Sequence, residues 1–280
     1  MELLFIVAAL ILGVASLTDL RTREVPDWLS FAGIAAGLGI RLIESASSLT
    51  WSPLIAGVFG FGFAWVLATA LFYLGQWGGG DSKMLMALGA LFGLEWSVFS
   101  FSVSFLVNLL FVGGVYGLFW MVTLALRHIQ KTRKAFEKLE SQHNMVIAKV
   151  IAHLVSTILL VIAYLSRASI WWFPLVLAAV LSLGSYYLFL MLRSVEAVCF
   201  LKKMPVSELT EGDWIYKDVK IKRMYLCGPK DLGISKQQIM LLKKYKIKDV
   251  LVKSGIPFIP SFLIAFGVTL AFGNLVFLLL

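Results

Sequence analysis

The sequence predicts an all-α polytopic membrane protein of about eight transmembrane helices, with a small α+β cytoplasmic insert before the last helix. Of its 280 residues, 60% are hydrophobic and only 15% are charged, whereas soluble domains carry about 25% charged residues. The mean hydropathy is +0.88. Long apolar runs recur along the chain, and most of the basic residues lie in two segments between them. This pattern excludes disordered, collagen-like and disulfide-scaffold proteins.

Eight apolar segments approach the length of a spanning helix, which is about 20 residues. The first follows Glu2 rather than a basic residue, so we expect it to remain in the protein as a span instead of being cleaved as a signal peptide. The expected spans are Leu3–Thr18, Trp28–Ile43, Pro53–Leu74, Ser82–Trp96, Val98–Leu126, Val150–Leu165, Ile170–Leu192 and Ile256–Leu280.

The charges predict the orientation of these spans. The chain has 25 Lys and Arg against 16 Asp and Glu, and 20 of the 25 lie in Arg127–Lys149 and Arg193–Ser254. Basic residues gathered in loops between spans are typical of the cytoplasmic face. We therefore expect a multi-pass protein of the plasma membrane that binds no nucleic acid. Alternation of the spans places Glu44–Ser52 outside and the segment before Asp81 inside.

The same reasoning divides the chain into five parts. They are a membrane core at 1–126, a basic cytoplasmic loop at 127–149, two further membrane helices at 150–192, a small soluble cytoplasmic domain at 193–254 and a last membrane helix at 255–280. Within the soluble domain, Asp213–Ile221 and Asp249–Val252 are expected to be strands. Ser235–Tyr245 is expected to be a helix with Ser235 as its N-cap.

Two aspartates are the strongest candidates for chemistry. Asp19 ends the first span and Asp81 begins the fourth, so alternation places both at the same depth on the inner side. Two facing carboxylates share a proton, so that one acts as a base toward water and the other as an acid toward a carbonyl. The run Gly78, Gly79 and Gly80 leaves backbone open to an extended substrate. The alternatives are a helix cap for Asp81, an ion pair with neighbouring arginines for Asp19, and a flexible link for the glycines.

The segments around these aspartates resemble the type IV prepilin peptidase family. Gly78–Lys83 (GGGDSK) is similar to its GxGD motif, Asp19–Asp27 (DLRTREVPD) to its first motif, and Lys253–Pro260 (KSGIPFIP) to archaeal members that include preflagellin peptidases. The resemblance implies that Asp19 and Asp81 are the catalytic pair. It implies as substrates the precursors of type IV pilin-like proteins or archaellins, cut on the cytoplasmic side. The cysteine-rich segment of bifunctional bacterial members is missing here, so methyltransferase activity is not expected.

The remaining candidates are charged residues near the two aspartates, together with the cysteines and histidines. Arg21 and Lys83 are expected to assist it or simply to reach lipid headgroups. Glu24 and Asp27 are candidates for binding the basic residues of a leader, and the alternative is a solvated loop. Cys199, Cys227 and the three histidines show no ligand spacing, so neither metal nor another cofactor is expected. The role of the helices within 150–192, the role of the insert and the oligomeric state stay open.

Two other functions remain alternatives. A presenilin-like or signal-peptide-peptidase-like intramembrane protease would carry Tyr-Asp where this chain has Thr18-Asp19. An ion-coupled transporter would place its acids near the bilayer midplane and show repeated halves, and the sequence shows neither feature.

Overall fold

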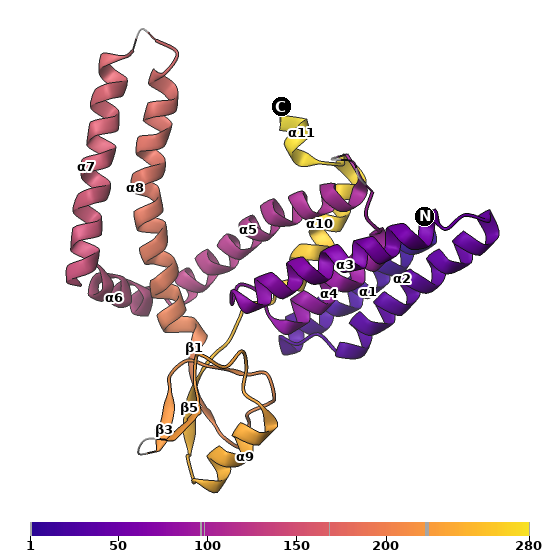
Figure 1. Ribbon diagram of the computed structural model, residues 1–280. Helices are drawn as coiled ribbons and strands as arrows, with labels where there is room; N and C mark the ends of the chain where they lie inside the picture. The colour runs from indigo at the N-terminus through magenta and orange to yellow at the C-terminus, as the bar shows by residue number, and fades with distance from the viewer. Residues whose placement is uncertain (1, 96, 98, 168, 222–223, 280) are drawn as a thin grey trace.

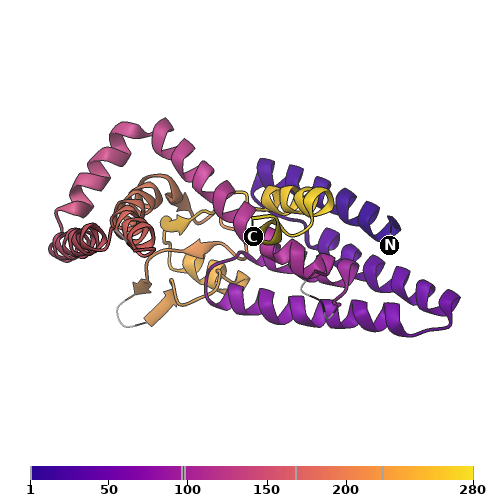
Figure 2. The same ribbon diagram turned by 90° about the horizontal axis from the view of Figure 1, so that it is seen from above.

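The computed structural model describes residues 2–95, 97, 99–167, 169–221 and 224–279. Its elements form three parts: a helical bundle, a long helical hairpin set apart from it, and a small domain with strands (Figure 1). The hairpin runs at a steep angle to the bundle, and it is seen end-on in Figure 2. The bundle consists of α1 (Glu2–Thr22), α2 (Asp27–Ser48), α3 (Ser52–Tyr73), α4 (Gly79–Phe92), the first part of α5 (Phe101–Arg127) and α10 (Ile259–Phe272).

Helix α4 is the centre of the bundle. Leu85 and Leu88 on α4 are almost fully buried and join a core that includes Phe105 of α5 and Phe262 of α10. Small residues let the neighbouring helices approach closely, as in other membrane bundles. A Cβ atom on Gly60 of α3 would lie only 2.3 Å from the backbone oxygen of Gly89. The core therefore fixes α4, and with it the depth of Asp81.

The structure does not confirm the expected eight spans. Among the described residues, six helices are long and apolar enough to cross a membrane: α1, α2, α3, α5, α7 and α8. Helices α4 and α10 have only 14 residues each, which gives about 21 Å at 1.5 Å per residue. They end at Gly93 and Gly273, whose positive φ angles stop the helix. Trp96, Val98 and Leu280, which bound expected spans, lie outside the described residues.

Arg41 supplies hydrogen-bond donors to the backbone oxygens at the buried C-terminal end of α4. Its guanidinium donates to the backbone oxygens of Ala90 at 3.1 Å, Leu91 at 2.8 Å and Pro53 at 3.2 Å. The last carbonyls of a helix have no partners within the helix, and leaving them unpaired in an apolar surrounding is costly. Arg41, which the sequence places inside an expected span, therefore allows α4 to end within the bundle.

Asn108 does the same for α10. Its side-chain amide donates to Thr269 Oγ1 at 2.9 Å and to the backbone oxygen of Gly273, at the point where α10 ends. Its amide oxygen accepts from the N–H of Leu275, the first residue of α11 (Leu275–Leu279). One fully buried side chain thus joins α5, α10 and α11.

The expected basic loop is largely helical. Helix α5 ends at Arg127, α6 (Ile129–Glu140) follows at once, and α7 begins at His143. Helices α7 (His143–Leu165) and α8 (Trp172–Val195) pack against each other as an antiparallel hairpin, and α6 lies across its base (Figure 1). This segment was expected to be a loop because α6 is too polar and too short to span a membrane.

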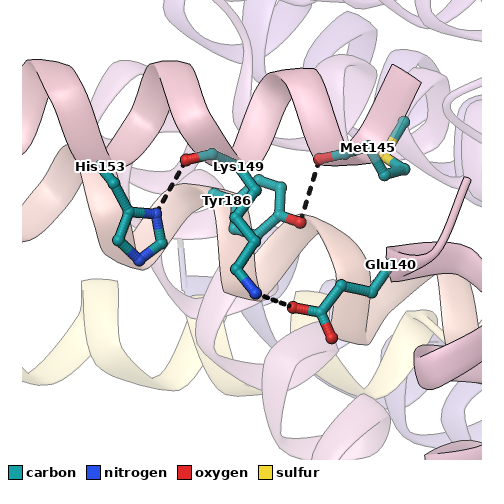
Figure 3. Close-up of polar contacts among 5 residues, drawn as sticks. All are labelled: Glu140, Met145, Lys149, His153 and Tyr186. Carbon is teal, nitrogen blue, oxygen red and sulfur yellow. Dashed lines mark hydrogen bonds and ion pairs between the residues drawn. The ribbon is translucent and has the colours of Figure 1, made fainter. Parts of the chain in front are cut away.

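Polar contacts join α6 to the hairpin at its base (Figure 3). Lys149 of α7 forms an ion pair with Glu140 of α6 at 2.8 Å. The hydroxyl of Tyr186 on α8 donates to the backbone oxygen of Met145 at 3.2 Å, and His153 Nδ1 lies 2.8 Å from the oxygen of Lys149. Most other large side chains of the hairpin are exposed apolar groups.

The insert is a small domain with its own core. Strands β1 (Leu201–Pro205), β5 (Asp249–Lys253) and β2 (Trp214–Ile215) form an antiparallel sheet in the order β1-β5-β2, and β3 (Val219–Ile221) pairs with β4 (Met224–Cys227). A π-helical turn, Glu196–Phe200, connects α8 to β1. Helix α9 (Lys236–Lys244) has Ser235 as its N-cap, as predicted.

The structure corrects the strand expected in the insert and shows the state of its cysteines. The expected strand at 213–221 is wrong as one element, because its two ends belong to different sheets. Cys199 and Cys227 are unpaired thiols. Burial raises the pKa of the Cys227 thiol to about 11, so it is protonated at neutral pH. The insert touches the bundle through Trp214, whose ring lies 3.5 Å from where a Cβ on Gly75 would stand.

Candidate active site

Asp19 lies at the end of α1 and faces the beginning of α10. Its side chain is buried, with 5% exposure. Oδ2 accepts a hydrogen bond at 2.9 Å from the backbone N–H of Ile259, the first residue of α10. The backbone N–H of Phe258 also interacts with this carboxylate. A carboxylate is favoured at such a position because the first N–H groups of a helix have no partners within the helix. The C-terminal segment, distant in sequence, therefore holds Asp19.

Asp81 lies in the first turn of α4. Its Oδ2 accepts a hydrogen bond at 3.2 Å from the N–H of Gly78, the N-cap residue. The side chain thus caps its own helix, which is the structural role weighed for it above. The carboxylate is half-buried and keeps a second oxygen that no hydrogen bond among the described residues engages. Capping therefore leaves Asp81 able to act on a ligand.

Asp19 and Asp81 lie on two helices that contact each other, α1 and α4. The end of α1 and the beginning of α4 meet at one end of the bundle, on the side of the insert (Figure 1). In each carboxylate, Oδ2 accepts a backbone N–H from another segment. Two carboxylates held in this way repel each other when both are ionised and favour a shared proton. The structure thus places Asp19 and Asp81 at the same end of the bundle, and their role as a catalytic pair stays a prediction.

The three glycines play unequal parts. Gly79 and Gly80 belong to α4, so the expectation that the whole run remains open backbone is wrong. None of the three has a positive φ angle. A Cβ on Gly80 would lie 3.1 Å from Cβ of Val25, and a Cβ on Gly78 would lie 3.2 Å from Asp81 Oδ2. On Gly79 it would meet only Phe72, at 3.9 Å. Close packing explains Gly78 and Gly80, and no contact requires Gly79.

The charged residues near the two aspartates differ in their partners and in their exposure. Lys83 forms an ion pair with Asp27 at 2.6 Å, which joins the first turns of α4 and α2. Arg21 and Glu24 are exposed, and no side-chain partner is found for Glu24 among the described residues. Arg23 Nη1 donates to the backbone oxygen of Gly255 at 3.4 Å. Glu24 is thus more available than Asp27 to a basic ligand.

Several residues of the site were not predicted as part of it. The segment Lys253–Pro260 was expected only to resemble a family motif, yet the backbone N–H of its residue Ile259 binds Asp19. Trp77, directly before the glycines, packs against Phe258. The Pro-flanked run IPFIP was the one sequence signal for such a contact.

The chemical groups at the site are carboxylates, backbone N–H groups and aromatic rings. Among the described residues, no three His, Cys, Asp or Glu side chains are grouped to hold a metal ion. The arrangement supplies what metal-free hydrolysis needs, namely one carboxylate to take a proton and another to give one.

Part of the chain is similar to known proteins. Residues 6–123 match the type IV leader peptidase family, and this range contains both aspartates. The preflagellin peptidase of Methanococcus maripaludis is 34% identical over 126 residues, which cover 43% of this chain and 54% of that protein. The preflagellin peptidase of Methanocaldococcus jannaschii is 38% identical over 87 residues, 31% of this chain and 37% of that protein. That of Methanococcus voltae is 31% identical over 78 residues, 28% and 33% of the two chains.

The matches thus cover between 33% and 54% of the relatives' own lengths. No solved structure matches the chain. Helices α6 to α8 and the insert lie outside the family match. Residues 6–123 are thus similar to the type IV leader peptidase family, and the chain spans about half or less of the length of the preflagellin peptidases that it matches.

Proposed function

We propose that this protein is a membrane aspartic endopeptidase that removes the leader peptide from type IV prepilin-like or preflagellin (archaellin) precursors. The observation that carries the proposal is the pairing of Asp19 and Asp81 at one end of the bundle, each held by a backbone N–H. The family match over the same residues and the names of the three relatives support it.

In the proposed reaction, the ionised carboxylate takes a proton from a water molecule that attacks the carbonyl carbon of the scissile peptide. The protonated carboxylate gives its proton to the carbonyl oxygen. The tetrahedral intermediate then collapses, the C–N bond breaks and the leaving nitrogen takes up a proton. No covalent enzyme intermediate is required.

The charges of the chain support a cytoplasmic site. The exposed lysines of α6 and most of the basic residues of the insert lie in segments that follow or precede apolar helices, as expected of the cytoplasmic side. The insert touches the α3–α4 loop through Trp214 and Gly75, so the insert and the aspartates share one face. A leader peptide would approach the site from that face, and its apolar helix would pack within the lipid.

The test is a cleavage assay in proteoliposomes that contain the full chain. An archaellin-like or pilin-like precursor is added, and the mass of the product identifies the bond that is cut. We expect a product shortened at its N-terminus, and we expect chelators to leave its rate unchanged. Substrate uptake without cleavage would favour the transporter alternative. A cut inside the apolar helix would favour a presenilin-like protease.

A further inference from the structure

The two backbone N–H groups that hold the catalytic pair each follow an aromatic residue. Gly78, which donates to Asp81, follows Trp77, and Ile259, which donates to Asp19, follows Phe258. The rings of Trp77 and Phe258 are in contact, with centroids 6.0 Å apart. The residues that precede the two donors therefore touch each other directly.

Neighbouring groups hold these rings in place. Phe262 of α10 packs against Trp77 at 5.3 Å and against Phe258 at 5.9 Å between ring centroids. On its other side, Phe258 lies against Gly113 of α5, where a Cβ would come within 2.9 Å of the Phe258 ring. Phe262 is fully buried. The position of the Phe258 ring is thus defined by α5, by α10 and by the segment before α4.

The contact between Trp77 and Phe258 joins two segments that are far apart in the sequence. The segment of Trp77 precedes α4, and the segment of Phe258 connects the insert to α10. Each side chain is one peptide bond from the N–H group that binds a carboxylate. The contact between the rings therefore joins the two segments that supply the N–H groups bound to Asp81 and Asp19. A misplacement of catalytic groups by about 1 Å can lower a rate by about 100-fold.

We infer that Trp77 and Phe258 are positioning residues that set the separation of Asp19 and Asp81 through their mutual contact. This inference rests on the proposed peptidase function. It concerns residues that touch no reacting atom, so their loss should lower kcat more than it affects substrate binding. The contact acts as a unit, so losing either ring should have the same effect as losing both.

The test compares two aromatic pairs, one in the segments that precede α4 and α10 and one within these two helices. The first set consists of Trp77→Ala, Phe258→Ala, the double variant and Trp77→Phe. The matched control is Phe92 of α4 with Phe266 of α10, which stack at 5.7 Å near the opposite end of α4. Phe92→Ala and Phe266→Ala remove an aromatic contact at least as extensive, away from the carboxylates. A further variant, Gly113→Ala, pushes on the Phe258 ring without altering it.

We expect Trp77→Ala and Phe258→Ala each to lower kcat at least about tenfold with KM changed less than about twofold. The double variant should be no slower than the slower single variant, Trp77→Phe should recover most activity, and Gly113→Ala should lower kcat. The control variants should lower thermal stability and leave kcat within about twofold. Multiplicative losses in the double variant, or equal losses of kcat in the control pair, would overturn the inference. A wild-type protein that cleaves no precursor would instead contradict the proposed function.

A second readout is independent of cleavage. Spin labels at Arg21→Cys and Gln76→Cys, both exposed positions beside the two motifs, report their separation after Cys199 and Cys227 are replaced by Ala. The distance distribution should broaden or shift in Trp77→Ala and Phe258→Ala but not in Phe92→Ala. An unchanged distribution in all three would overturn the inference.

Discussion

The carboxylate of Asp19 accepts a hydrogen bond at 2.9 Å from the backbone N–H of Ile259, 240 positions further along the chain. The first and the last long helical segments of the protein therefore meet at the proposed catalytic pair. Since Ile259 follows the insert by only a few residues, the insert and the site are connected through one short stretch of backbone. The Arg23 contact with Gly255 holds this stretch at a second point.

Replacing Gly79 or Gly80 by alanine should slow cleavage to different extents. A Cβ on Gly80 would press on Val25 at 3.1 Å, whereas one on Gly79 would meet only Phe72 at 3.9 Å. We expect Gly80→Ala to slow cleavage about tenfold or more, which corresponds to about 1.4 kcal/mol, and Gly79→Ala to stay within about threefold of wild type. The measurement is the rate of precursor cleavage.

The steric explanation has its own control. Replacing Val25 by Ala in the Gly80→Ala protein removes the methyl groups that the new Cβ meets and should restore most of the rate. If Gly79→Ala is as slow as Gly80→Ala, or if Val25→Ala restores nothing, the glycines serve the approach of substrate rather than the packing of α4.

Much of this site could be predicted from the sequence, and the reasons for the failures are physical. Asp19 and Asp81 stand out because carboxylates are costly at the ends of apolar helices, and alternation of the spans predicts that both lie at the same depth. The contact of Asp19 with Ile259 joins distant segments through the backbone, which no side-chain pattern reveals. Ser235 was predicted as a cap because capping is local.

The end of helix α4 could not be predicted from hydropathy alone. A hydropathy window extends it to Trp96, because apolar residues continue beyond Gly93. It ends at Gly93, whose positive φ angle stops the helix, and Arg41 binds the last carbonyls so that the helix can end in a buried place. That depends on a tertiary contact between α2 and α4, and a count of apolar residues does not contain it.

Arg41 is predicted to matter for stability rather than for chemistry. Its three acceptors are backbone oxygens in a buried region, and an unpaired buried acceptor costs about 1–3 kcal/mol. A lysine cannot reach all three, because its ammonium lacks the planar fork of a guanidinium. We expect Arg41→Lys and Arg41→Gln to lower the melting temperature of the detergent-solubilised protein by several degrees.

The matched control is Arg133→Lys, since Arg133 is exposed on α6 and pairs only with Glu137. This variant should melt within about 1 °C of wild type, because exposed ion pairs contribute little. An Arg41→Lys protein as stable as wild type would show that the three hydrogen bonds do not hold α4.

The recognition of a basic leader should depend on Glu24 and on Lys83, the ion-pair partner of Asp27. Glu24 is exposed with no side-chain partner among the described residues, while Asp27 is paired with Lys83. Under the proposal that both acids bind the leader, Glu24→Gln should raise KM and Lys83→Gln should lower it. Each change should stay below about tenfold, since exposed pairs contribute about 0.2–1 kcal/mol.

The comparison uses a native precursor and one whose leader lysines and arginines are replaced by glutamine. The effects of both variants should disappear with the neutral leader and shrink as salt is added. If Glu24→Gln and Lys83→Gln change KM in the same direction, or equally for both leaders, these residues do not recognise leader charge and form a solvated loop instead.

The central claim is that Asp19 and Asp81 act together as the catalytic pair, and the most direct measurement is cleavage by Asp19→Asn and Asp81→Asn. Asparagine keeps an oxygen that accepts the N–H of Ile259 or Gly78 but neither takes nor gives the proton. Each variant should be inserted and folded, as judged by its melting temperature, and should cleave at least about 1,000-fold more slowly than wild type. Glu137→Gln, an acid-to-amide change on α6, should cleave normally. Either aspartate variant retaining more than a few per cent of wild-type cleavage would contradict the account.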